Sequence, residues 1–395
     1  MPETLEFTPT LPIPIHLVGE VHSKLAYLDE AVLGSEISPT GDRISLILNK
    51  PVEGDRRAEL EDKLQRVVVS MVKGAIRPKV QILEDHLDRG VPFNADPHDE
   101  LLARRELSQE ARGIFALGPM ISRLIAWFEE HFVGLADSFG AAPYRFPTLI
   151  PASYLERVDY FSAFPHSLTF ATHLRTDLDV IDHFAREAAC GEGGELAAPP
   201  GSFAPVRALL SPAVCYHLYF SLADQPLPAE GVIATSVGNC FRHEATNLTS
   251  LERLWNFTMR EVIFVGSKEF VLDHRETARL RTAQFLGDIG LAYRVESAND
   301  PFFIGEFRKQ VAFQSAFQLK YEIRARLPFK DSTLAVGSYN YHQDFFGRRL
   351  NITLPDGSPI HTGCVAFGLE RVAYAFLAQF GLDPRDWPDV VRKDF

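Results

Sequence analysis

The chain contains 395 residues, of which 46% are hydrophobic and 23% are charged. These values are ordinary for a soluble globular protein and exclude the collagen-like, disordered and disulfide-scaffold classes. Forty lysines and arginines stand against 52 aspartates and glutamates, which gives a formal net charge of -12. A surface this acidic is a poor non-specific binder of nucleic acid, because phosphate contacts depend on clustered Lys and Arg. A local basic patch is still compatible with this balance.

The cysteines and the first residues indicate the cellular compartment. The four cysteines lie far apart and form no Cys-x-x-Cys pair, which favours a reducing compartment. The N-terminal sequence MPETLEFTPTLPIPIHL lacks the basic start and the apolar run of a signal peptide. No stretch approaches the roughly 18 consecutive apolar residues of a membrane span. We therefore expect a cytoplasmic protein with no membrane partner.

The first hundred or so residues predict a small α/β module. Residues 44–48 alternate as in a short strand, and residues 55–73 carry apolar side chains at helical spacing. The polar run at 94–100 is typical of a linker. We place a boundary near residue 105, which divides the chain into an N-terminal module of unknown role (1–105) and a larger domain (106–395).

The larger domain begins with a helix that opens at Gly118-Pro119, where proline suits the first helical position. One face of this helix is apolar and supplies surface for either a core or a subunit interface. Further along, residues 189–205 form the most loop-like stretch of the chain. The apolar stripe of the helix consists of Leu124, Ile125, Phe128 and Phe132.

Strand-like runs recur from residue 231 onward, with helical stretches between them. Helices are expected at 267–289, 306–319 and 369–380. Several strands close together in sequence, with helices set apart, are typical of a mainly antiparallel sheet flanked by helices. The predicted fold class is therefore α+β.

Two segments of this domain carry residues suited to a nucleotide. The first is Phe-Arg-His-Glu at 241–244, followed by a short polar loop and a strand with Phe257 and Glu261 on one face. An arginine, a carboxylate and an aromatic ring on adjacent strands suit the phosphate, the amine and the base of a nucleotide. A cross-strand ion pair beside a core phenylalanine gives the same pattern, so spacing alone leaves both interpretations open.

The second segment is GCVAFGLER at 363–371. An apolar strand meets Gly368 and then a helix, which places Arg371 in the first helical turn. A cation there opposes the helix dipole, and a polyphosphate opposite the arginine would account for it. An exposed arginine that reaches into water is the simpler explanation when the segment is taken alone.

Together these segments resemble motifs 2 and 3 of the class II aminoacyl-tRNA synthetases. The resemblance implies the antiparallel sheet of that class and a bound ATP. A helix-strand unit at 119–151 resembles the dimer-forming motif 1 loosely, which implies a homodimer. KYEIRARLP (320–328) and DFFGRRLNI (344–352) resemble stretches of seryl-tRNA synthetases. The motif positions fall on Phe241, Arg242, Glu244, Arg253 and Phe257 for motif 2, and on Gly368 to Arg371 for motif 3.

The resemblance is more specific to a smaller family, the amino acid:carrier protein ligases, which are truncated relatives of the archaeal-type seryl-tRNA synthetases. It covers residues 110–385 in order, whereas residues 1–105 match no known pattern. In that family two cysteines and a glutamate hold a zinc ion, and the amino group of the substrate takes the open position. The ligand positions fall on Cys215, Glu261 and Cys364. The stretches that resemble the family include FPTLIPASYLERVDYFSAFP, SPAVCYHLY, CFRHE, FTMREVIFVG, ANDPFF, SYNYHQDFFG and HTGCVAFGLER.

The resemblance also implies the reaction and the role of each residue. An amino acid would be activated by ATP as an aminoacyl-adenylate and then transferred to the phosphopantetheine thiol of a carrier protein. Arg242 would hold the α-phosphate and the substrate carboxylate, Glu244 would bind near the adenine amine, and Phe257 would stack on adenine. Arg253 and Arg371 would grip the γ-phosphate. Small amino acids are expected, with glycine, alanine and serine leading.

Several points stay open at the level of sequence. Magnesium is expected with ATP, but residues 334–342 lack the magnesium-binding glutamate that seryl enzymes carry there. A seryl-tRNA synthetase is an alternative that would need a tRNA-binding domain, and a non-catalytic regulatory paralogue is another. We expect a carrier protein, and not tRNA, as the acceptor. A docking patch for an acidic carrier, or an ordinary solvated face, is formed by Arg324, Arg326, Arg348 and Arg349.

Overall fold

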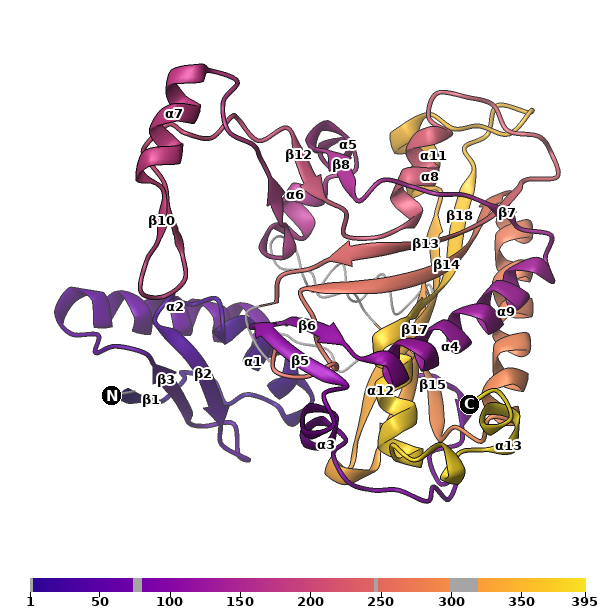
Figure 1. The fold of residues 1–395 in the computed structure, drawn as a ribbon, viewed down its shortest axis with the longest axis horizontal. Helices are drawn as coiled ribbons and strands as arrows, with labels where there is room; N and C mark the ends of the chain where they lie inside the picture. Colours follow the sequence, from indigo (N-terminus) through magenta and orange to yellow (C-terminus); the bar gives the residue numbers. More distant parts are fainter. Residues whose placement is uncertain (1–2, 74–79, 245–247, 299–318) are drawn as a thin grey trace.

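The structure is a computed structural model, which describes residues 3–73, 80–244, 248–298 and 319–395. Its central element is an eight-stranded sheet in the order β4-β15-β16-β17-β18-β14-β13-β7 (Figure 1). All neighbours in this sheet are antiparallel except β7 with β13. The predicted α+β class is therefore confirmed. The strands are β4 (Ile82–Asp85), β15 (Tyr293–Ser297), β16 (Lys320–Leu327), β17 (Ser332–Gln343), β18 (His361–Gly368), β14 (Asn256–Gly266), β13 (Val232–Phe241) and β7 (Ala142–Pro143).

The two faces of the sheet carry different side chains, because successive residues of a strand point to opposite sides. On β14, Val262 and Phe264 lie in the larger hydrophobic core, whereas Ile263 lies in a second cluster on the other side. Val365 and Cys364 of β18 divide between the same two clusters. One face of the sheet is thus a packing surface, and the other is left to carry functional groups.

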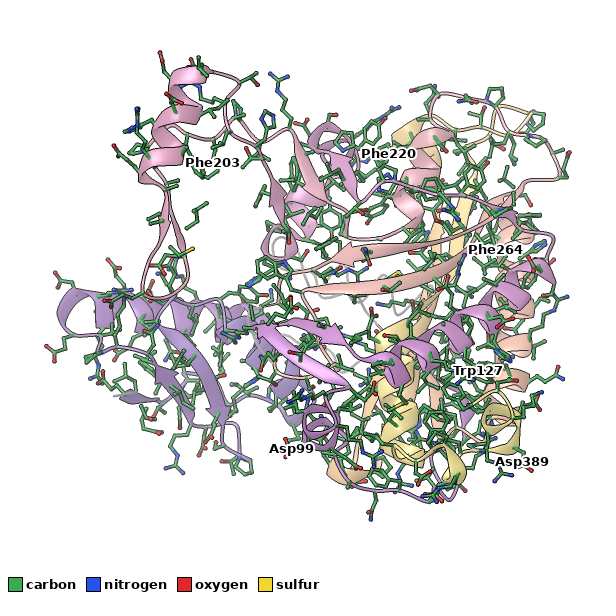
Figure 2. All side chains as sticks on the ribbon, in the orientation of Figure 1. Asp99, Trp127, Phe203, Phe220, Phe264 and Asp389 are labelled. Atoms are coloured by element: carbon green, nitrogen blue, oxygen red, sulfur yellow. The ribbon has the colours of Figure 1, made fainter. Side chains whose placement is uncertain are left out.

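Three helices cover the packing face: α4 (Pro119–Asp137), α9 (Lys268–Asp288) and α12 (Leu369–Phe380) (Figure 1). Side chains crowd the layer between them and the sheet (Figure 2). The rings of Phe132 and Phe367 stack there, with their centroids 3.8 Å apart. The apolar stripe of α4 therefore contributes to this core, where Leu124, Phe128 and Phe132 are buried and Ile125 packs against them.

The opposite face carries α8 (Cys215–Ser221) and α11 (Phe345–Leu350) over the second hydrophobic cluster. Beside them an arm extends away from the body and ends in a short hairpin within the stretch expected as loop at 189–205 (Figure 1). Its helix α7 (Leu178–Glu187) has no buried residue. The other elements of this part are β8 (Leu149–Pro151), α5 (Ala152–Arg157), α6 (Tyr160–Ala163), β9 (Phe170–Ala171), β10 (Ala189–Cys190), β11 (Leu196–Ala197) and β12 (Ala208–Leu210).

Residues 3–72 form a module with a hydrophobic core of its own. The strand expected at 44–48 is present. The helix expected at 55–73 is also present, and it begins and ends one residue earlier than expected. The strand β4 pairs with β15 in the central sheet, and Leu101 lies in the larger core. The body therefore begins before residue 105. The elements of this region are β1 (Glu3–Phe7), α1 (Val18–Leu25), β2 (Val32–Ile37), β3 (Ile44–Leu48), α2 (Gly54–Val72), α3 (His98–Ala103), β5 (Leu107–Ala111) and β6 (Ile114–Leu117).

The remaining helix predictions have different outcomes. The helices expected at 267–289 and 369–380 are confirmed as α9 and α12. The helix expected at 306–319 falls almost wholly on residues outside the described part of the chain. Beyond α12 the chain ends in α13 (Asp389–Arg392). None of the helices that the structure describes is both long and apolar enough to cross a membrane.

Candidate active site

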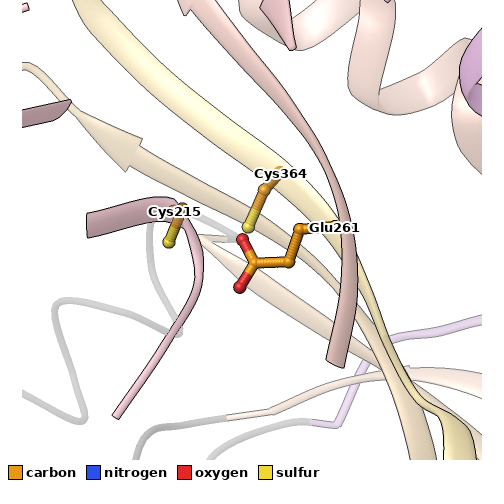
Figure 3. A group of neighbouring side chains, drawn as sticks. All are labelled: Cys215, Glu261 and Cys364. Atoms are coloured by element: carbon orange, nitrogen blue, oxygen red, sulfur yellow. The ribbon is translucent and has the colours of Figure 1, made fainter. Parts of the chain in front are cut away.

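Three side chains from distant parts of the chain form a buried cluster that could hold a metal ion. Cys215 begins α8, Glu261 lies on β14 and Cys364 lies on β18 (Figure 3). Their ligand atoms all lie within 4.8 Å of one another, and each residue is at most 5% exposed. Ile263 pairs with Cys364, so Glu261 is two positions away on the same face of the neighbouring strand. The three expected ligands are therefore brought together.

The chemistry of this cluster fits a divalent cation. Glu261 Oε2 is buried and has no hydrogen-bond partner among the described residues, while Oε1 accepts the Val214 N–H at 3.2 Å. Burial raises the pKa of Glu261, and the adjacent Cys364 thiol together with burial raises that of Cys215. Anionic forms of these groups are costly here unless a cation accompanies them. Two thiolates and a carboxylate select zinc over magnesium, and three protein ligands leave one position open.

Two residues that the sequence analysis missed surround the cluster. Asn340 Nδ2 donates hydrogen bonds to Cys364 Sγ at 3.4 Å and to Ser338 Oγ at 2.9 Å. Asn340 pairs with Cys364 across β17 and β18, so the strand register could have identified it. Tyr219 is fully buried, and burial raises the pKa of its phenol, with the negative charges of Cys215, Cys364 and Glu261 acting in the same direction. The phenol is therefore a protonated donor beside the cluster.

Three of the predicted phosphate-binding residues are neighbours. Burial lowers the pKa of Arg253 to about 10, and the charge of Arg371 lowers it further. Burial likewise lowers the pKa of Arg371, and Arg242 adds to the effect. Arg371 lies in the first turn of α12 as predicted, and its Nη1 donates to the Ala335 carbonyl at 3.3 Å. Half-buried guanidiniums that repel one another are stabilised by a bound polyanion.

The segment Phe-Arg-His-Glu at 241–244 has the expected neighbours, but the strand that carries it is shorter than expected. β13 ends at Phe241, so Arg242 and Glu244 lie after the strand and not on it. Arg242 Nε donates to the Pro212 carbonyl at 2.9 Å, and its guanidinium lies 5.5 Å from the ring centroid of Phe257. Glu244 forms an ion pair with Arg253. These two residues, both predicted to contact a nucleotide, are therefore partners of each other in this structure.

An apolar cluster lies between the metal-binding and arginine groups. Val214, Cys240, Met259 and Ala366 are buried together, and Phe257 packs against them. Burial raises the pKa of Cys240 to about 12, so this thiol is a core residue. Glu261, the predicted ligand, and Phe257, the predicted stacking residue, therefore lie on the same face of β14. Met259 lies between them on that face.

The N-terminal module reaches this region through the turn that follows α1. The ring of Tyr27 lies edge-on to His166, with centroids 5.3 Å apart. The carbonyl of the next residue, Ser167, accepts a hydrogen bond from the His243 N–H at 3.1 Å. His243 stands between Arg242 and Glu244 in the sequence. The module is therefore in contact with a segment that is hydrogen-bonded to the strand end predicted to bind a nucleotide.

The four arginines considered as a carrier-docking patch do not gather in one place. Arg324 faces the beginning of β17, where it pairs with Ala335. Arg348 and Arg349 lie on α11, which follows the end of β17. Arg326 lies two residues beyond Arg324 on β16 and pairs with Thr333, also near the beginning of β17. The four arginines are therefore two pairs, one near each end of β17.

Comparison with known proteins then fixes the family. No family model matches the chain. Over 307 residues it is 34% identical to amino acid--[acyl-carrier-protein] ligase 1 of Bradyrhizobium diazoefficiens, which covers 76% of this chain and 90% of the relative. The chain belongs to the amino acid--[acyl-carrier-protein] ligase family. Ligase 2 of the same organism is 36% identical over 250 residues, which is 63% of this chain and 72% of the relative.

Members of a second group align with more of the chain at lower identity. The type-2 serine--tRNA ligase of Methanopyrus kandleri is 24% identical over 388 residues, which is 94% of this chain and 71% of that protein. The crystal structure of M. kandleri SerRS with A. aeolicus tRNASec superposes with a TM-score of 0.72 at 21% identity. It covers the whole of this chain and 77% of that one. The class II synthetase fold is therefore confirmed, and the fold likeness includes residues 1–105.

The buried cluster predicts metal content. Purified protein should hold about one zinc ion per chain, because the cluster offers three ligands of the kind that zinc prefers. Replacing Cys215 or Cys364 by serine should abolish binding, as measured by elemental analysis after gel filtration. The exposed Cys190 is the matched control, and Cys190→Ser should keep the metal. Zinc-free protein that is nevertheless active would contradict the assignment.

Proposed function

We propose that this protein activates a small amino acid with ATP and transfers the aminoacyl group to the phosphopantetheine thiol of a carrier protein. The observation that carries the proposal is the buried Cys-Glu-Cys cluster on the same sheet face as the nucleotide-binding residues. Membership of the ligase family supports the same reaction. Zinc is the proposed resident metal, and magnesium accompanies ATP as substrate. The free thiols of the cluster suit a cytoplasmic location.

The arginines are assigned to the phosphates. When the substrate carboxylate attacks the α-phosphorus and pyrophosphate leaves, negative charge shifts among phosphate oxygens, and fixed guanidiniums stabilise it. Arg242 is assigned to the α-phosphate and the carboxylate, and Arg253 and Arg371 to the γ-phosphate. Glu244 would exchange its ion pair with Arg253 for the adenine amine, while Phe257 stacks on the base.

The Cys-Glu-Cys cluster is assigned to the amino group of the substrate. When zinc is bound by Cys215, Glu261 and Cys364, its open position can accept a neutral amine. The three side chains are at most 5% exposed, so solvent access to a metal held there would be limited. Met259 and Ala366 beside it offer no polar partner to a long or charged side chain, which supports glycine, alanine or serine as substrate.

Transfer to tRNA is a second candidate function, favoured by the span of the alignment with serine--tRNA ligases. That alignment covers 94% of the chain, against 76% for ligase 1. We propose residues 3–72 as a separate module, and its charge argues against tRNA. The module has seven Lys and Arg against twelve Asp and Glu, a formal net charge of -5. Binding to a phosphate backbone needs the opposite sign.

The arginine assignment predicts the activity of two variants. ATP–pyrophosphate exchange should depend on glycine, alanine or serine and be slight with bulky amino acids. Arg242→Ala and Arg371→Ala should each lower the exchange rate by about 10²–10³, which is the usual effect of losing a charge-stabilising donor. Arg385, whose side chain is 88% exposed, provides the control, and Arg385→Ala should exchange normally. If Arg242→Ala and Arg371→Ala both catalyse ATP–pyrophosphate exchange at the wild-type rate, the assignment of these arginines to the phosphates is wrong.

The acceptor is tested directly by offering both candidates to the protein. With ATP and the preferred amino acid, a holo carrier protein should acquire a label that mild hydroxylamine or alkali releases, as expected for a thioester. The apo carrier, which lacks the phosphopantetheine thiol, is the control and should stay unlabelled. Total tRNA should remain at background. Robust aminoacylation of tRNA by the pure protein would overturn the choice of acceptor.

We also propose a homodimer, formed through the surface that follows α4. The α4 stripe is in the core, but Leu149 on β8 is 48% exposed and Phe170 on β9 is 59% exposed. Both belong to the sheet in the order β8-β12-β9. Exposed apolar side chains that form one contiguous patch are a candidate subunit interface.

The dimer is tested by sedimentation. The protein should sediment at twice the chain mass of 44.3 kDa. The double variant Leu149→Asp, Phe170→Asp should sediment as a monomer, because two buried charges would face each other across the two-fold axis. Leu280 on α9 is 56% exposed, and Leu280→Asp should remain dimeric. A wild-type monomer at micromolar concentration counts against the proposal.

A further inference from the structure

Each of two metal-ligand side chains has a hydrogen-bond donor outside the ligand set. The Val214 N–H donates to Glu261 Oε1 at 3.2 Å, and Asn340 Nδ2 donates to Cys364 Sγ at 3.4 Å. Such outer contacts fix the orientation of a metal ligand and stabilise its anionic form. Among the described residues, no donor outside the ligand set meets the hydrogen-bond geometry at Cys215 Sγ, but Tyr219 lies close enough for a hydrogen bond with Cys215 to raise the pKa of the phenol.

Tyr219 carries a hydroxyl group of the kind that is missing at Cys215. Its phenol oxygen is buried and has no hydrogen-bond partner within the parts of the chain that the structure describes. A buried hydroxyl without a partner is destabilising, so its retention calls for an explanation. Tyr219 is 0% exposed, so bulk solvent does not reach its hydroxyl group.

The helix geometry directs this hydroxyl toward Cys215. Both residues lie on α8, and a spacing of four residues places them on the same helix face. Long side chains in a helix lean toward its N-terminus, which here is the end that Cys215 occupies. Phe346, with its ring centroid 4.4 Å from that of Tyr219, and His342, at 6.0 Å, pack against the ring and limit its rotation.

We propose that Tyr219 is a positioning residue of the metal site, whose phenol donates a hydrogen bond to the Cys215 thiolate and holds that sulfur for the metal. The proposal rests on the zinc site of the proposed function. It gives each of the three ligands one outer donor: a backbone amide for Glu261, a side-chain amide for Cys364 and a phenol for Cys215.

The test is the variant Tyr219→Phe, which keeps the ring and removes only the hydroxyl. Its zinc dissociation constant, measured by competition with a chromophoric chelator, should be about 10- to 100-fold higher than that of the wild type, as for other outer contacts of metal ligands. In cobalt-substituted protein the thiolate-to-cobalt charge-transfer band should shift. Tyr216→Phe is the matched control, since this ring on the same helix packs against Tyr160 and Phe346. It should leave both readouts unchanged.

A purely structural role is separated by measuring unfolding with and without metal. In metal-free protein Tyr219→Phe should be as stable as the wild type or more so, because it removes an unsatisfied buried hydroxyl. With zinc it should be less stable than the wild type. Equal loss of stability in both states, or an unchanged zinc affinity, overturns the proposal for Tyr219 while leaving the metal site intact. A wild-type protein that binds no zinc overturns both.

Discussion

Successive side chains of β14 and β18 point to opposite faces of the central sheet, and the organisation of the site follows from that alternation. Val262, Phe264 and Val365 pack the sheet against its helices. The residues that alternate with them point to the opposite face, where the candidate site lies. Glu261 and Cys364 are therefore held by strands whose other faces are fully packed. A rigid support of this kind fixes ligand positions more closely than a loop does.

Opposite charges are separated along the functional face. Three acidic ligand groups gather at one end and three arginines at the other, with the apolar cluster of Val214, Met259 and Ala366 between them. Like charges lie close together at each end, and at the arginine end Glu244 is paired with Arg253. The proposed metal at one end and the proposed triphosphate at the other would balance both, and the small amino acid of the proposed reaction would join them.

Much of the local structure could be predicted from the sequence. The helix at 369–380 and the strand at 44–48 follow directly from apolar periodicity. Periodicity could not associate Cys215 with Glu261 and Cys364, which lie 46 and 149 positions further along the chain. The family resemblance was needed to group these three residues. The roles of Asn340 and Tyr219 depend on strand register and on an unsatisfied hydroxyl. Both are properties of the folded chain.

The wide separation of the three ligands in sequence has a consequence for the order of events during folding. The loops from Cys215 to Glu261 and from Glu261 to Cys364 span 46 and 103 residues. Closing loops of this length early costs conformational entropy that a few contacts cannot offset. A register slip of one residue on β18 would also turn Cys364 to the other face. We therefore expect the ion to be captured last, so that metal uptake marks chains whose central strands have already aligned correctly.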